Sequence, residues 1–180
     1  AVALETLGNA LSRTDRHEEA RGLLERALEV EGRALGPEHP RRAETLTNLG
    51  NALYRRGKVA ESIARGREAL ALQEKVLGPE QLRVADTLGN LAVVLAGQGS
   101  YAEALALDER SLAIREKRLG PDHADVGLVL NNIAVIYDEQ GKYAEAAGYY
   151  ARSLRVREKV FGPRHHEVAL VLANLGDSLV

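Results

Sequence analysis

Hydrophobic and polar positions follow a helical period along the whole chain. Leu46, Leu49 and Leu53 lie three or four residues apart, the spacing that places apolar side chains on one face of an α-helix. The same spacing returns further along the chain at Leu88, Leu91 and Leu95, and again at Leu130, Ile133 and Tyr137. No stretch alternates apolar and polar residues with a period of two, so we expect no β-strand.

Glycine-proline pairs divide this pattern into repeats. They stand 42 residues apart, within the copies ALGPEH, VLGPEQ, RLGPDH and VFGPRH, at Gly36-Pro37, Gly78-Pro79, Gly120-Pro121 and Gly162-Pro163. A constant period of about 20 to 50 residues is typical of a stacked repeat array. Gly57, Gly99 or Gly141 marks a second turn inside the repeat, because glycine suits the backbone conformation that ends a helix.

Each repeat is therefore predicted to be a pair of helices. The expected helices are about 1–13, 17–35, 40–56, 59–77, 82–98, 101–119, 124–140, 143–161 and 166–180. Stacked side by side, they form an all-α solenoid in a single domain. Its repeats are about 1–38, 39–80, 81–122 and 123–164, followed by a final helix at 165–180. The chain starts without Met and stops within a helix, so we expect a segment of a longer protein.

Three stretches of first helix and turn carry a family resemblance. TLTNLGNALYRRGKVAES, TLGNLAVVLAGQGSYAEA and VLNNIAVIYDEQGKYAEA resemble tetratricopeptide repeats, in the 42-residue form typical of kinesin light chains and many bacterial relatives. Small residues occupy the places where that family packs its helices closely, at Gly8, Gly50, Ala92, Ala134 and Gly176. The resemblance implies a right-handed superhelix of antiparallel helix pairs and a protein-interaction role.

Two repeats depart from the family pattern in their second helix. Gly66 and Asp108 stand where Leu24 and Tyr150 provide a large side chain. We expect looser packing in these repeats, at a cost of about 1–3 kcal/mol each if the space stays empty. We expect Asp108 to turn toward solvent through a small helix rotation, because an unpaired buried charge is costly.

A rank of asparagines marks the candidate recognition surface. The resemblance implies that first helices line a concave groove that holds extended peptides. One repeat position is shared by Asn48, Asn90, Asn132 and Asn174, with Asn9 and Asn51 three residues further along their helices and Asn131 one residue earlier. An amide both donates and accepts, so it can pair with any peptide group. The alternative is a structural ladder, in which these amides bond to neighbouring helices or local backbone.

The positions around the asparagines change in character along the array. The beginning of the groove is expected to be acidic and polar, from Glu5, Glu44, Tyr54 and Asp86, and the end more apolar, from Val93, Leu128 and Val135. Relatives hold a free peptide C-terminus with a lysine where this chain has Glu5. The resemblance therefore favours an internal peptide segment with apolar anchors, or a folded partner.

The second repeat is rich in basic residues. They are Arg41, Arg42, Arg55, Arg56, Lys58, Arg65 and Arg67. One interpretation is a solvated face neutralised by Glu44, Glu61 and Glu68; the other is a contact with an acidic partner.

Composition narrows the classes of partner. The 180 residues carry a net charge of -2, which provides no basic surface for nucleic acid or an anionic membrane. Cysteine is absent, so disulfides and thiolate metal sites are excluded. No apolar run approaches the roughly 18 residues of a membrane span. We expect a cytoplasmic protein that binds proteins or peptides, without nucleic-acid or membrane partners. Abundant Ala and the excess of Arg over Lys suggest a bacterial source.

Candidate catalytic and metal-binding residues have simpler explanations. His39, His123 and His165 stand a repeat apart, with Gln81 in the remaining copy, and metal ligands must converge on one ion. Helix capping or loop packing is the expected role. The GKV and GKY stretches at Gly57 and Gly141 lack the Ser or Thr of a phosphate loop. We expect no enzyme, metal or cofactor. The alternative function is a structural, regulatory or self-associating arm of a larger multidomain signalling protein.

Overall fold

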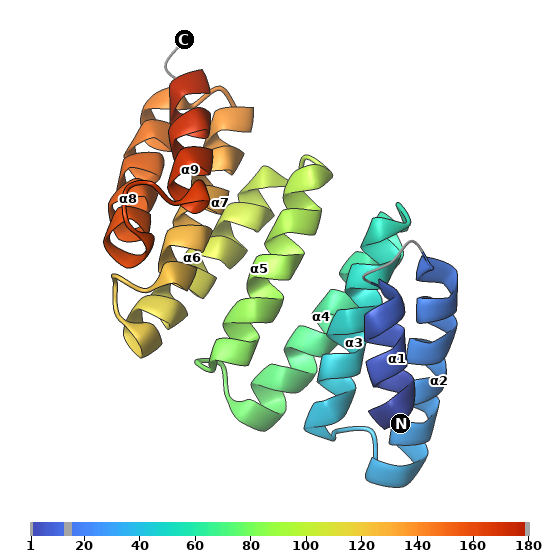
Figure 1. Cartoon of the computed structure of the whole chain (residues 1–180). Helices are drawn as coiled ribbons and strands as arrows, with labels where there is room; N and C mark the ends of the chain where they lie inside the picture. The colour runs from blue at the N-terminus through green and yellow to red at the C-terminus, as the bar shows by residue number, and fades with distance from the viewer. Residues whose placement is uncertain (1, 13–15, 179–180) are drawn as a thin grey trace. The chain divides into compact units, whose positions relative to one another are not determined.

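Helices make up all the regular structure that is described. The computed structural model describes residues 2–12 and 16–178, without the side chains of Asn9 and Ser12. Every element in these ranges is an α-helix (Figure 1). The helices are α1 (Val2–Ser12), α2 (His17–Leu35), α3 (Pro40–Arg55), α4 (Val59–Leu77), α5 (Leu82–Gly97), α6 (Tyr101–Leu119), α7 (Ala124–Glu139), α8 (Tyr143–Phe161) and α9 (His166–Asp177).

The predicted helix boundaries agree closely with these bounds. Those of α2, α4, α6 and α8 are confirmed, whereas α3, α5 and α7 each end one residue earlier than predicted. The predicted helix that corresponds to α9 was too long, because α9 ends at Asp177 and Ser178 caps it. Residues 1, 13, 179 and 180, which the predicted helices included, lie outside the described part of the chain.

Glycines end the helices as the sequence predicts. Gly57, Gly99 and Gly141 have positive φ angles of 73°, 82° and 71°. The glycines of the four Gly-Pro pairs have φ between 83° and 88°. Glycine adopts such angles at little cost because it has no Cβ.

Three histidines begin the helices that follow the Gly-Pro turns. The Nδ1 atom of His39 accepts a hydrogen bond from the backbone N–H of Arg41 at 3.2 Å. His123 does the same for Asp125 at 3.2 Å, and His165 for Glu167 at 3.3 Å. Each bond satisfies a backbone donor that has no partner within its own helix. The predicted capping role is confirmed.

The chain divides into two compact units. Unit 1 comprises residues 1–94, and within it α1 packs on α2, α2 on α3 and α3 on α4. Its core contains Leu24, Leu49, Ala52 and Leu53. A Cβ atom added to Gly8 would lie 2.9 Å from Cγ of Leu24, so the glycine lets α1 approach α2 closely.

Unit 2 comprises residues 95–180, and within it α6 packs on α7, α7 on α8 and α8 on α9. One core cluster contains Leu112, Val126, Val129, Leu130, Ile133 and Val156. A second contains Ala134, Ala146, Tyr150 and Val171. Ala134 is buried as the family pattern implies, whereas the small residue of α9, Gly176, is exposed.

Neither departure from the family pattern has the predicted consequence. A Cβ added to Gly66 would lie 2.9 Å from Cγ of Leu91, so Leu91 fills the space that we expected to be loose, apart from a cavity of about 10 Å³. Asp108 does not turn to solvent: it is 0% exposed. Both predictions are wrong, because a neighbouring side chain compensates at Gly66 and α6 keeps its register at Asp108.

Asp108 is a buried carboxyl group without hydrogen bonds. Neither carboxyl oxygen has a hydrogen-bond partner among the described residues. Burial raises the pKa of Asp108 from 3.8 to about 7, against the opposing effect of the positive charge of Arg115. A raised pKa means that the neutral form is favoured in the folded protein.

A second set of buried polar residues occupies one repeat position of the second helices. Its members are Glu31, Gln73, Arg115 and Arg157, all less than 9% exposed. Arg115 lies 3.1 Å from the carboxylate of Asp125, and Arg157 forms an ion pair with Glu167. In unit 1 the charge is reversed: Glu31 accepts a hydrogen bond from Thr45 at 3.2 Å, and Arg41 occupies the repeat position of Asp125.

Candidate functional site

The first helices of unit 1 form a polar surface with a hollow in it. The hollow has a volume of about 350 Å³. Helices α1, α3 and α5 supply most of its lining, and α4 contributes one residue. The lining residues are Glu5, Glu44, Thr47, Asn48, Gln73, Arg83, Asp86 and Thr87. We call it the acidic hollow, because its three carboxylates and one guanidinium give a net charge of -2.

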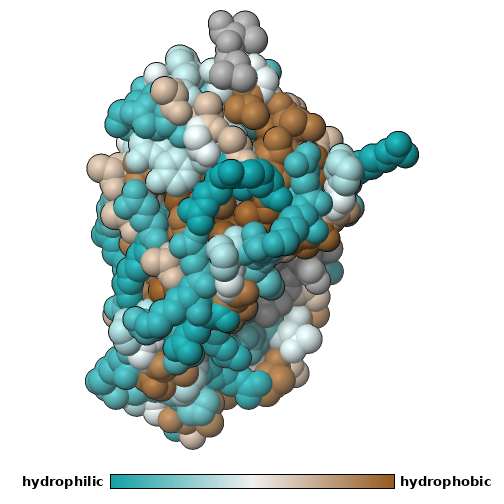
Figure 2. Space-filling model, turned by 90° about the vertical axis from the view of Figure 1, so that its left-hand side faces the viewer, coloured by the Kyte–Doolittle hydropathy of each residue, from teal (hydrophilic) through white to brown (hydrophobic). Residues whose placement is uncertain are grey.

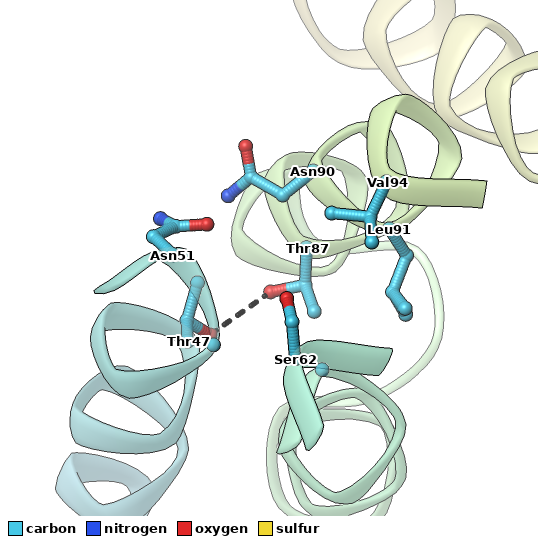
Figure 3. Close-up of a pocket in the computed structure, with 9 residues that line it drawn as sticks. Thr47, Asn51, Ser62, Thr87, Asn90, Leu91 and Val94 are labelled. Carbon is cyan, nitrogen blue, oxygen red and sulfur yellow. Dashed lines mark hydrogen bonds between the residues drawn. The ribbon is translucent and has the colours of Figure 1, made fainter. Parts of the chain in front are cut away.

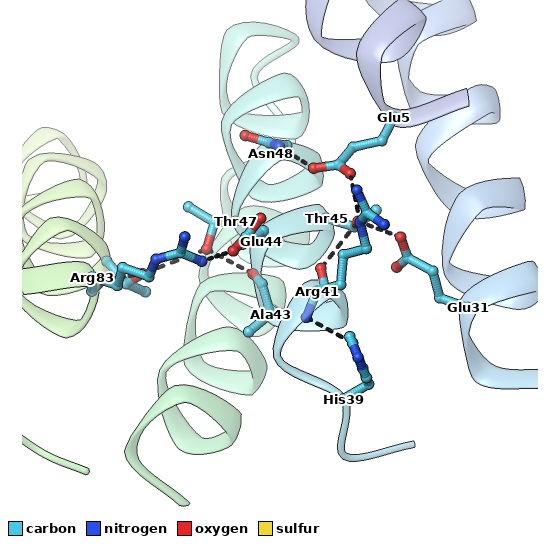
Figure 4. Close-up of polar contacts among 11 residues, drawn as sticks. Glu5, Glu31, His39, Arg41, Ala43, Glu44, Thr45, Thr47, Asn48 and Arg83 are labelled. Carbon is cyan, nitrogen blue, oxygen red and sulfur yellow. Dashed lines mark hydrogen bonds and ion pairs between the residues drawn. The ribbon is translucent and has the colours of Figure 1, made fainter. Parts of the chain in front are cut away.

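Polar contacts connect the helices around the acidic hollow (Figure 4). Glu44 of α3 forms an ion pair with Arg83 of α5. The hydroxyl groups of Thr47 and Thr87 lie 3.4 Å apart. The hollow brings together four of the predicted groove residues, Glu5, Glu44, Asn48 and Asp86.

Glu5 has only long contacts within this network. Its Oε1 accepts a hydrogen bond from Nδ2 of Asn48 at 3.5 Å, and its Oε2 lies 3.7 Å from Nε of Arg41. Burial and the nearby charge of Glu31 raise the pKa of Glu5, and Arg41 opposes them. The carboxylate is therefore incompletely compensated by its neighbours.

Asn51 and Asn90 lie on the same side of unit 1. In Figure 3 the two amides extend toward one another from α3 and α5. Both residues are exposed, and neither has a hydrogen-bond partner in the described ranges. The small cavity that they line with Gly50 and Gly66 has a volume of about 10 Å³, enough for about one water molecule.

Unit 2 presents asparagines from α7 and α9. Nδ2 of Asn174 donates a hydrogen bond to Oδ1 of Asn131 at 3.4 Å, longer than most N–H···O bonds. Asn132 is half-buried and has no hydrogen-bond partner in the described part of unit 2. Thus Asn48 and Asn174 make long contacts within the scaffold, whereas Asn51, Asn90 and Asn132 keep their amides unpaired.

The predicted apolar positions differ in exposure. Leu128 of α7 is 47% exposed and Val93 of α5 is 44% exposed. Val135 is half-buried against the cluster that contains Tyr150. Asn9 belongs to α1, but its side chain is outside the described residues.

The sequence analysis did not identify Arg83, Gln73, Thr47 or Thr87 as lining residues. A signal existed for Gln73, because Glu31, Gln73, Arg115 and Arg157 repeat at an interval of 42 residues. A polar residue at every copy of a position within the helix pattern indicates buried polar contacts. Thr45 and Thr87 repeat at the same interval.

Most basic residues of the second repeat have local partners. Arg56 pairs with Glu18, Lys58 with Glu61 at 3.2 Å, and Arg65 with Glu68 at 2.8 Å. The predicted neutralisation by Glu61 and Glu68 is confirmed. Glu44 has a different role, because it pairs with Arg83 of α5.

Two other kinds of site are absent from the described residues. In residues 2–12 and 16–178, no group of three His, Cys, Asp or Glu side chains is placed to hold a metal ion. No described helix is both long and apolar enough to cross a membrane.

Sequence comparison identifies the family. The profile of the tetratricopeptide repeat family matches four overlapping stretches, residues 1–75, 44–117, 83–159 and 139–180. The chain belongs to the tetratricopeptide repeat family. Members of this family generally mediate protein–protein interactions and are typically non-catalytic. A comparison with curated proteins finds no match.

Two solved structures share the fold of this chain. A crystal structure of a putative kinesin light chain with nearly identical TPR-like repeats from Podosopora anserina has a TM-score of 0.85 and 23% identity. The match covers 98% of this chain and 83% of that one. BtubC (BKLC) from P. vanneervenii has a TM-score of 0.87 at 20% identity, over 97% of this chain and 70% of that one. These similarities support the predicted helical solenoid of kinesin-light-chain-like repeats.

Proposed function

We propose that this tetratricopeptide repeat chain is a non-enzymatic interaction module that binds an extended peptide segment or a partner protein along its first helices. The observation that carries the proposal is the set of unpaired amides at Asn51, Asn90 and Asn132, which project from first helices. An unpaired amide can donate to a peptide carbonyl and accept from a peptide N–H. Exposed Val93 and Leu128 supply apolar contacts beside them.

The lack of a hydrogen-bond partner for these three amides among the described residues favours recognition over the structural ladder. Asn is a mediocre helix former, so an asparagine within a helix gains little for the fold when its side chain makes no contact. A peptide that pairs with the amides would compensate for this cost through hydrogen bonds that do not depend on its side chains.

Peptides selected from a random display library on the purified chain test the proposal. The affinity of a selected peptide is measured by fluorescence anisotropy for wild type and for the Asn51→Ala/Asn90→Ala variant. We expect a loss of roughly tenfold or more, because a net hydrogen bond contributes about 0.5–1.5 kcal/mol. Glu29→Ala, at an exposed position of the second helix α2, is the control. Unchanged affinity of the folded double variant would argue against the proposal.

A second candidate function is self-association as a structural arm. Leu170 and Leu172 of α9 are 57% and 48% exposed. Hydrophobic side chains also gather toward the top of the face that Figure 2 shows. Sedimentation of wild type and Leu172→Ser over a range of concentrations tests it. A concentration-dependent dimer that Leu172→Ser weakens supports this function, and a monomer throughout excludes it.

A further inference from the structure

The acidic hollow has more negatively charged than positively charged side chains in its lining. Carboxylates of Glu5, Glu44 and Asp86 enter its lining from three helices, and Arg83 is the one lining residue with a positive charge. Arg83 is already paired with Glu44. The volume of about 350 Å³ falls in the range of ligand-binding pockets. The hollow is thus large enough for a cationic side chain.

Gln73 adds an observation that is independent of the carboxylates. It is 4% exposed and comes from the second helix α4, behind the first helices. Its buried Oε1 atom accepts no hydrogen bond from any of the described residues. A buried acceptor without a donor costs about 1–3 kcal/mol. The residue lines the hollow, so a donor placed there can supply the missing bond.

Glu5, which also lines the hollow, likewise lacks a close hydrogen-bond donor. Its two contacts, at 3.5 Å and 3.7 Å, are longer than a strong charge-assisted hydrogen bond of about 2.7–2.9 Å. A ligand that satisfies both Glu5 and Gln73 needs several N–H donors and a positive charge. Arginine provides five donors in one plane, whereas lysine provides three at one point.

We propose that the acidic hollow binds an arginine side chain of the partner's peptide segment. The proposal rests on the proposed function, because the partner lies along the first helices of unit 1. The guanidinium group donates to Gln73 and to the carboxylates of Glu5 and Asp86, and its charge offsets the net charge of the lining. The recognised partner is therefore basic at this point of the segment.

A titration with a single blocked amino acid tests the hollow without a partner. The probe is N-acetyl-arginine N-methylamide, and the uncharged control is the corresponding citrulline compound. Side-chain amide signals in nitrogen-15 NMR spectra of the whole chain report binding. We expect the Gln73 signal to shift with the arginine probe, to shift little with citrulline, and to respond less at high salt. Equal shifts with both compounds would overturn the proposal.

Charge-removing variants test the same site. Glu44→Gln/Asp86→Asn removes two negative charges from the lining with little change in shape, and we expect it to bind the arginine probe at least tenfold more weakly. The matched control is Glu61→Gln/Glu68→Gln, which removes two charges from exposed positions of α4 outside the hollow. It should bind the probe as wild type does. Equal binding by the two double variants contradicts the proposal.

Library peptides separate this inference from the proposed function. If selected peptides bind along the first helices and tolerate replacement of every arginine by citrulline, the proposed function stands and the arginine site is wrong. If the arginine probe binds at Gln73 but no peptide binds, the site stands and the proposed function is wrong. Selected peptides that lose affinity on citrulline replacement, and do so through Glu44 and Asp86, support both.

Discussion

Asp108 occupies a position where two of the other repeats place a large side chain. Leu24 and Tyr150, at the matching positions, are 0% and 1% exposed. The carboxyl group is equally buried, and its oxygens have no hydrogen-bond partners in the described chain. This residue therefore reduces the stability of unit 2 whenever it is ionised.

The stability of the protein should depend on pH through Asp108. Its pKa is about 7 in the folded chain against 3.8 as the ordinary value, so the folded state holds a proton that the unfolded state has lost between these values. The contribution of Asp108 to stability falls as pH rises through this window and is constant outside it. Urea unfolding at pH 5 and pH 8 should show the loss in wild type but a smaller one in Asp108→Asn. The same pH dependence in both proteins would contradict this assignment.

At the scale of the element, the Gly-Pro turns fix where each repeat ends. Gly120 has a φ of 88° and a ψ of 158°, a combination that is essentially restricted to glycine. Gly148 lies within α8, and a Cβ added there would have no atom within 4 Å. The two glycines differ in backbone conformation, whereas a Cβ atom would meet no steric clash at either position.

Alanine substitution should separate these two glycines. Gly120→Ala is expected to lower the free energy of unfolding by about 1–3 kcal/mol, because alanine is strained at this backbone conformation. Gly148→Ala should raise it by about 0.5–1 kcal/mol, because alanine is the better helix former. Chemical unfolding of the two variants measures both effects. Equal effects of the same sign would show that the turn does not require glycine.

A second prediction for the helices concerns the stability that the capping histidines provide. His123→Ala removes the acceptor for the backbone N–H of Asp125, which should cost about 0.5–2 kcal/mol. His123→Asn is the matched control, since asparagine is a favourable N-cap residue and should restore most of the stability. Thermal unfolding compares the two variants. A full loss in both would mean that the imidazole ring acts through packing.

At the scale of the whole molecule, contacts join helices that are close in sequence. In unit 1 α1 packs mainly on α2, α2 on α3 and α3 on α4, with a smaller contact between α1 and α3, and in unit 2 α6 packs on α7, α7 on α8 and α8 on α9. The stability of such an array is approximately a sum of local terms. Truncation of one core side chain should therefore destabilise mainly the helices that it contacts.

Leu24→Ala tests this locality. Leu24 is 0% exposed in the core of unit 1, so its truncation should cost about 2–5 kcal/mol. Hydrogen exchange is expected to speed up in α1, α2 and α3 while α8 and α9 keep their wild-type protection. Uniform acceleration in all helices would show that the chain unfolds as one cooperative unit.

The sequence was sufficient for the fold because every repeat carries the same boundary signals. Turn glycines and capping histidines predicted the helix ends to within a residue from α2 to α8. Packing at single positions was harder to predict. At Gly66 the deciding contact comes from Leu91, 25 positions later in the chain, and no local pattern shows that a leucine will turn into the space.

The candidate site was predictable in part, for a similar reason. The repeat spacing placed Glu44, Asn48 and Asp86 on one surface, and they line one hollow. Gln73 was missed because it reaches the hollow from a second helix, which the resemblance assigns to packing. Contacts between residues far apart in sequence, such as that of Glu5 with Asn48, require the three-dimensional arrangement.

The reversed sign of the buried charges restricts how repeats can be recombined. Second helix α2 carries Glu31, whereas α6 and α8 carry Arg115 and Arg157, each matched by an acid on the following helix. A chimera that joins α2 directly to α7 would set the buried carboxylate of Glu31 against the partly exposed carboxylate of Asp125, two like charges with no positive charge to offset them. Repeats with the same spacing are thus not interchangeable. Gene duplication or unequal crossover within this array would preserve the fold only where the charges that meet between adjacent helices are opposite.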